Sequence, residues 1–137
     1  MRRVGLALTI LMATGTGLAA ADSKGEVRVE PRIEAMLKRI DPADRLEQIC
    51  DYAAAIRIGR DKTHFHPDRA VIDSISPVKI KGDTVKGSGG AFRSRGQWYQ
   101  FSFTCETTPD RLKVLSFDYR IGDKIPEDKW DEYGLWR

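Results

Sequence analysis

The 137-residue sequence contains little of what marks the most easily recognised classes of small protein. Two cysteines are too few for a disulfide-rich miniprotein or a four-cysteine zinc site. Neither sign of charge is in large excess, since 23 Lys and Arg residues face 20 Asp and Glu residues, which argues against a general nucleic-acid-binding protein. The sequence does have an ordinary globular composition, with 41% hydrophobic and 31% charged residues, and a length that suits one domain.

The first 21 residues have the pattern of a secretory signal peptide. Arg2 and Arg3 form a basic start, residues 4–18 carry no charge, and Ala19 to Ala21 are the small residues typical of a cleavage site. The apolar stretch is shorter than the roughly 20 residues of a membrane anchor. The residues that flank the arginine pair do not favour the twin-arginine pathway, and no cysteine follows the cleavage point to carry a lipid. We therefore expect a periplasmic or secreted protein, exported by the general secretion route, with no transmembrane segment after cleavage.

After cleavage, residues 22–137 would carry a net charge of about +1, because both charges of the leader are arginines. Export also affects the expected state of the two cysteines. An exported chain enters an oxidising compartment, so Cys50 and Cys105 are expected to form a disulfide. A redox-active or metal-binding pair is the alternative, but the sequence has no C-x-x-C motif. The bond would close a long loop and contribute roughly 4 kcal/mol in the chain-entropy model.

The first half of the exported chain is patterned for helices. Residues 22–30 are polar and are expected to form a flexible lead-in. Pro31 suits the first position of a helix, and apolar residues recur at helical spacing as far as Ile40. Asp41 and Pro42 predict the start of a second helix, which should end near Gly59. The apolar stripe of this second helix consists of Leu46, Ile49, Cys50, Ala53 and Ile56.

After a polar connection at residues 60–69, the apolar period changes from 3.6 to 2, which predicts strands. The first strand is expected over Val71–Ile75, and a tight hairpin follows over residues 78–86. In that hairpin Lys79 should lie opposite Lys86. The glycine-rich run at residues 87–90 predicts a bulge or a flexible break.

A second hairpin is expected around the dipeptide Arg95-Gly96, which pairs Arg93 with Trp98. The apolar face of its second strand consists of Tyr99, Phe101, Phe103 and Cys105, and that of the last strand consists of Leu115, Phe117, Tyr119 and Ile121. Residues 126–133 predict a short terminal helix. The predicted fold class is α+β, with the N-terminal helices packed on an antiparallel β-meander and a short C-terminal helix, all within a single domain from residue 31 to residue 137.

Several separate blocks, in order along residues 40–136, resemble the domain of unknown function numbered 930, a group of small exported alphaproteobacterial proteins. These blocks are residues 41–48 with Cys50, residues 66–69, 90–99, 113–117, 125–130 and 133–136. The resemblance implies a bacterial origin, a place in the cell envelope and one compact domain. It implies no activity and no catalytic residue.

His64 and His66 are the only histidines of the chain, and they are candidate metal ligands. They lie on one side of an extended segment, with Asp61 and Asp68 nearby. Neutral imidazoles and a carboxylate suit zinc or copper, so a small periplasmic metal-binding protein or metalloenzyme is one hypothesis. The H-x-H pattern alone supplies two dependable ligands, and the alternative is a plain polar connection between helix and sheet.

Signals for catalysis are weaker. The chain has no G-x-S-x-G motif, and a disulfide would remove both thiols as nucleophiles. The glycine run lacks the Lys-Ser/Thr ending of a phosphate-binding loop. We therefore favour a non-catalytic protein without a cofactor, and we keep a hydrolase with a dispersed site as a further alternative.

The best candidate surface is the side of the sheet that faces away from the helices. Arg93 and Trp98 are expected to stand opposite each other there, with Arg120 beside Trp98 on the next strand and Arg95 in the turn. An indole flanked by guanidinium groups suits an envelope protein, a glycan or an anionic lipid head group as the partner. We expect no nucleic-acid partner, because the net charge is small. Two structural alternatives remain: the Arg–Trp contact only stabilises the strands, or the tail covers this face with Trp130, Tyr133, Leu135 and Trp136.

Overall fold

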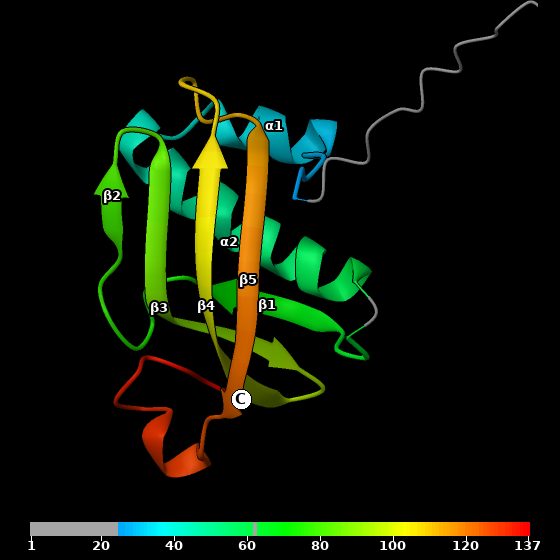
Figure 1. Cartoon of the computed structure of the whole chain (residues 1–137), viewed down its shortest axis with the longest axis vertical. Helices are drawn as coiled ribbons and strands as arrows, with labels where there is room; N and C mark the ends of the chain where they lie inside the picture. The colour runs from blue at the N-terminus through cyan, green and yellow to red at the C-terminus, as the bar shows by residue number, and fades with distance from the viewer. Residues whose placement is uncertain (1–24, 62) are drawn as a thin grey trace, which may run out of the picture.

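The computed structural model describes residues 25–61 and 63–137, so the expected signal peptide and the start of the lead-in lie outside the described residues. Within these residues, two α-helices precede an antiparallel sheet of five strands, which confirms the predicted α+β class (Figure 1). No helix in this part of the chain is long and apolar enough to cross a membrane. The elements are α1 (Pro31–Leu37), α2 (Pro42–Arg60), β1 (Pro67–Val71), β2 (Lys79–Lys81), β3 (Thr84–Ser94), β4 (Gln97–Thr107), β5 (Val114–Lys124) and a 3-10 turn, η1 (Glu127–Lys129).

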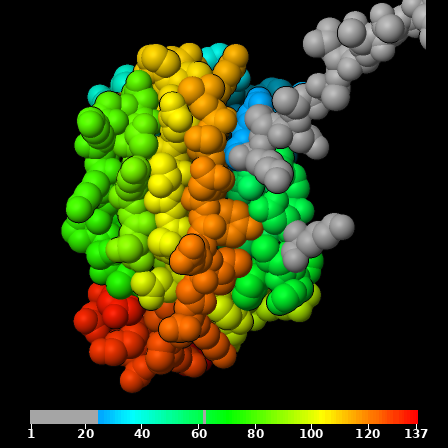
Figure 2. Space-filling model, viewed as in Figure 1, coloured from blue at the N-terminus to red at the C-terminus, as the bar shows by residue number. Residues whose placement is uncertain are grey.

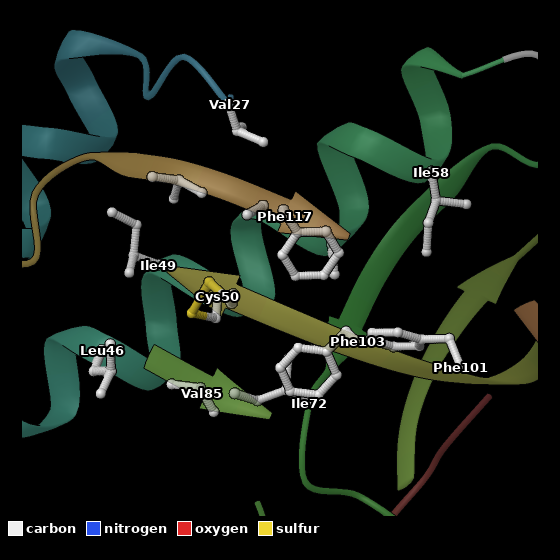
Figure 3. Packing of buried hydrophobic residues seen from close by; sticks show 14 of the residues in the cluster. Val27, Leu46, Ile49, Cys50, Ile58, Ile72, Val85, Phe101, Phe103 and Phe117 are labelled. Carbon is white, nitrogen blue, oxygen red and sulfur yellow. A yellow bond between two sulfur atoms is a disulfide. The ribbon is translucent and has the colours of Figure 1, made fainter. Parts of the chain in front are cut away.

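Helix α2 starts where the sequence predicts. The Asp41 side chain accepts the Ala43 N–H at 2.8 Å, and Pro42 occupies the first helical position. The helix runs one residue past Gly59, to Arg60. Its buried residues, which face the inner side of the sheet, are Leu46, Ile49, Cys50, Ala53, Ala54 and Ile58 (Figure 3).

The sheet is more than a simple meander, because β1 and β2 share one edge of β3. β2 pairs with residues 84–86 at the start of β3, and β1 pairs with residues 91–94 at its end. β4 and β5 then follow in order. Lys79 lies opposite Lys86, as the hairpin pattern predicts.

The strand predicted over Val71–Ile75 is wrong, because β1 covers Pro67–Val71. The chain leaves the sheet at Ile72, whose backbone N–H donates to the Asp51 side chain on α2 at 2.8 Å. A carboxylate thus takes the place of a neighbouring strand as the hydrogen-bond partner. Alternation of apolar residues does not reveal such a partner.

The glycine run forms the predicted bulge, with a shift of register between Gly87 and Gly90. The loop between β1 and β2 rests on it, since the Ile75 N–H donates to the Gly89 carbonyl at 2.8 Å. A Cβ atom at Gly89 would lie 2.1 Å from the Ser76 Oγ atom. The absence of a side chain at this position therefore lets the loop pass close to β3.

The β3–β4 hairpin has the predicted turn and register. Arg95 and Gly96 have φ angles of 52° and 75°, the left-handed pair that a two-residue turn needs. Arg93 pairs with Trp98. The predicted inner face of β4 is also confirmed, because Phe101, Phe103 and Cys105 are buried and Tyr99 is partly buried against the same core.

The main core lies between α2 and the inner face of the sheet, where the rings of Phe103 and Phe117 stack at 5.8 Å (Figure 3). Cys50 on α2 and Cys105 on β4 form the expected disulfide-compatible pair, with their Cα atoms 6.1 Å apart. Leu115, which the pattern predicts on this face, is instead 49% exposed. The register of β4 and β5 shifts after Glu106, so that Val114 occupies the buried position.

Both ends of the described chain pack against the sheet. The lead-in is not free from Gly25 onward, because the Gly25 carbonyl accepts the Phe117 N–H and Val27 is buried beside Val114. The short C-terminal helix predicted over residues 126–133 is only the 3-10 turn η1, followed by further turns. The tail then folds back over one end of the sheet (Figure 1).

Candidate functional site

Trp98 does not lie on an exposed face, and this part of the predicted surface needs correction. Its side chain is fully buried in a second, smaller core, and its Nε1–H donates to the Trp136 carbonyl at 2.7 Å. The tail covers it, which is the second structural alternative that the sequence left open. The buried residues of this second core are Ala91, Trp98, Ile125, Trp130 and Leu135.

Arg93 is held in place by structural contacts. Its guanidinium donates two hydrogen bonds to the Asp68 carboxylate, at 3.0 and 2.7 Å. It also lies 5.7 Å from the Trp98 ring centre and 5.8 Å from that of Trp136. The hydrogen bond from Arg93 holds the pKa of Asp68 below its usual range. Arg93 therefore fastens the tail to β1 and β3.

The other two arginines of the predicted surface lie apart from each other. Arg95 is exposed in the β3–β4 turn. Arg120 lies opposite Ser102, not beside Trp98, because the β4–β5 connection is longer than the three-residue turn that the sequence suggested. The longer connection moves Arg120 towards the middle of the sheet.

Arg120 instead lines a hollow of about 600 Å³ on the outer face of the sheet, together with Lys79 and Lys86. This face is turned to the viewer in Figure 2, with β3, β4 and β5 side by side. Its polar groups come from adjacent strands, since Lys86 pairs with Thr104 and Thr104 with Asp118. The lining residues that carry polar side chains are Lys79, Lys86, Ser88, Ser102, Thr104, Asp118, Tyr119 and Arg120.

The charge of this hollow is positive. Lys79, Lys86 and Arg120 are all exposed, and none forms an ion pair with a residue that the structure describes. Asp118 is the single carboxylate among the lining residues. Like charges placed directly opposite each other destabilise a strand pair, so Lys79 and Lys86 carry a cost that an anion would relieve. The arrangement suits the binding of a negatively charged group.

The structure places His64 and His66 at the surface, in the segment that leads into β1. His64 is exposed with a φ angle of 57°, and the His66 N–H donates to the Ser94 hydroxyl at 2.9 Å. The nearby carboxylates are engaged elsewhere, since Asp61 accepts the Tyr119 hydroxyl and Asp68 holds Arg93. Among the described residues, no three His, Cys, Asp or Glu side chains gather where they could hold a metal ion.

Sequence reasoning missed a second feature, a groove between the helices and β1 with Asp51 in its lining. Burial, together with the nearby Glu47 and Asp73, raises the pKa of Asp51 to about 7, although the hydrogen bond from Ile72 opposes the change. The sequence signal for this feature is Asp51 itself, a carboxyl group directly after Cys50 of the apolar stripe of the helix. The groove itself could not be foreseen, because Trp136 contributes to it from the far end of the chain.

The fold defines a small α+β protein whose main helix and sheet carry a disulfide-compatible cysteine pair. The family model described as Domain of Unknown Function (DUF930) matches residues 37–135, and the chain belongs to this family. No curated protein and no solved structure matches the chain.

Proposed function

We propose that this protein is a non-catalytic binding module of the bacterial cell envelope that holds an anionic glycan on the outer face of its sheet. The observation that carries the proposal is the hollow with three exposed cations, Lys79, Lys86 and Arg120. Their side chains stand on hydrogen-bonded strands, so the positive charge is fixed in position before a ligand arrives. Such preorganisation lowers the entropic cost of binding.

The chemistry of the hollow favours a glycan over a membrane or a protein partner. Hydroxyl groups from Ser88, Ser102 and Thr104 lie among the cations and can hydrogen-bond to sugar oxygens. The described chain exposes four large hydrophobic side chains, and none of them lines the hollow. A membrane surface would need apolar side chains that insert, and a stable protein interface would need an apolar centre.

The proposed location outside the cytoplasm rests on two observations. The leader has the three parts of a secretory signal peptide. The Cys50–Cys105 pair suits an oxidising compartment, since cytosolic proteins rarely keep structural disulfides. Together they support export of an alphaproteobacterial protein to the periplasm or beyond.

The test measures binding to an immobilised uronic-acid polysaccharide. The double variant Lys79→Gln, Lys86→Gln should bind roughly five- to thirtyfold more weakly than the unchanged protein, because two favourable surface charges are lost. The control, Lys38→Gln with Arg39→Gln, removes the same charge near the end of α1 and should bind normally. Raising the salt concentration should weaken binding of the unchanged protein.

Three results would reject the proposal. The first is equal binding by the two double variants, which would mean that net charge alone acts. The second is equal binding to a neutral polysaccharide. The third is tighter binding to vesicles that contain anionic phospholipid, which would assign the hollow to lipid head groups.

A further inference from the structure

A second hollow in the described part of the chain is the groove between α1, α2, β1 and the tail, which has a volume of about 500 Å³. This volume lies in the range of sites for small ligands. Its apolar walls include Met36 of α1, Tyr52 of α2 and Trp136 of the tail. Met36 and Trp136 are 50% and 46% exposed, so two of the large hydrophobic side chains that the described chain exposes border the same groove. An apolar ligand would remove both from water.

The polar lining of the groove includes two carboxylates, those of Asp51 and Asp68. Asp51 uses its Oδ1 atom to accept the Ile72 N–H, and Asp68 is engaged by Arg93. Arg69 is the one basic residue among the lining residues of the groove. Asp51 forms no ion pair with any residue that the structure describes.

The surroundings of Asp51 add further negative charge. Glu47 precedes it by one helical turn, and Asp73 follows the Ile72 that donates to it. Both raise the pKa of Asp51, as does its burial, so a positive charge placed beside Asp51 would offset all three effects. The groove thus combines apolar walls with a carboxylate that lacks a cation.

We propose that this groove binds a small organic cation, with its ammonium group at the Asp51 carboxylate and its apolar body against Met36, Tyr52 and Trp136. An aromatic ring beside a cation adds attraction through its electron-rich face. The proposal does not depend on the glycan site, because the two sites share no lining residue.

The experiment compares three probes that share one apolar chain: n-hexylammonium, n-hexanol and n-hexanoate. Binding is measured by calorimetry and located by the NMR signal of the Trp136 indole N–H. We expect n-hexylammonium to bind and to shift this signal, and the other two probes to bind at least tenfold more weakly, because they lack the charge-assisted hydrogen bond. The Lys79→Gln, Lys86→Gln double variant should bind n-hexylammonium normally.

Asp51→Asn is the decisive variant, because the asparagine amide still provides an oxygen to accept the Ile72 N–H. It should bind n-hexylammonium about tenfold to a hundredfold more weakly. The matched control, Asp123→Asn, removes an exposed carboxylate outside the groove and should bind normally. Equal binding by both variants, or equal binding of n-hexanol and n-hexylammonium, would overturn the proposal.

The pH dependence of binding gives a second test that needs no variant. Only the ionised Asp51 carboxylate attracts the ammonium, so the affinity of the unchanged protein should rise about tenfold or more between pH 5 and pH 8. The probe itself stays charged over this range, since alkyl ammonium groups titrate near pH 10. Asp68 stays ionised over this range, because the hydrogen bond from Arg93 lowers its pKa, whereas burial raises the pKa of Glu47, one helical turn before Asp51. An affinity that is flat across this range would reject the role of Asp51.

Discussion

At the scale of the residue, Asp51 makes the free energy of unfolding of this protein depend on pH. Its pKa is about 7 in the folded chain, against 3.8 as the ordinary value, so between these values the folded state binds more protons than the unfolded state. The free energy of unfolding should therefore fall as the pH rises from about 4 to about 7. The loss is on the order of a few kcal/mol.

Urea unfolding at pH 5 and pH 8 measures this effect. In Asp51→Asn the fall should be smaller, and at pH 8 the variant should be more stable than the unchanged protein. Asp123→Asn, at an exposed position, should keep the full fall. The same slope in Asp51→Asn would show that another group controls the pH dependence.

Trp98 is the single residue whose removal should damage the end of the sheet most. Trp98→Ala should lower the free energy of unfolding by about 3–5 kcal/mol, since it empties the second core and removes the hydrogen bond to Trp136. Arg95→Ala, in the exposed turn next to it, should change stability by less than about 0.5 kcal/mol. Chemical unfolding of both variants checks the difference. A stable, fully folded Trp98→Ala would contradict the burial of this indole.

At the scale of the element, the bulge in β3 is the feature least tolerant of change. Gly89→Ala would place a Cβ atom 2.4 Å from the backbone nitrogen of Ser76, so the loop between β1 and β2 must move. We expect a loss of about 1–3 kcal/mol. Gly82→Asn is the control, because nothing lies within 4 Å of a Cβ atom there and asparagine accepts its positive φ angle. Equal thermal shifts in the two variants would contradict the close packing of this loop.

Within the sheet, strand pairs joined by a short turn could be predicted, whereas a strand end fixed by a distant residue could not. The β3–β4 hairpin follows from a two-residue turn and a strict alternation, both of which are local. β1 was misplaced because the end of the strand is set by Asp51, 21 residues earlier. The position of Arg120 failed for a related reason, since one longer loop shifts a whole strand. Of the four residues of the predicted surface, Arg120 alone lines the hollow on the outer face of the sheet.

At the scale of the whole molecule, the cysteine pair links the helical layer to the sheet, which no other described covalent contact does. Reduction, or the double variant Cys50→Ala, Cys105→Ala, should lower the free energy of unfolding by roughly 4 kcal/mol through the entropy of the unfolded chain. The check is urea unfolding with and without dithiothreitol. The double variant serves as the control, because the reductant should not affect it. Identical curves for the unchanged protein with and without reductant would contradict the link.

The C-terminal tail that covers Trp98 also determines whether the second core is shielded from solvent. Trp130 and Leu135 complete a core that Ala91 and Trp98 begin. A chain shortened by a few residues, whether by incomplete synthesis or by trimming, would display a bare indole and its apolar neighbours. Proteases and chaperones recognise such exposed apolar surfaces, so a shortened chain should be a better target for them than the intact chain.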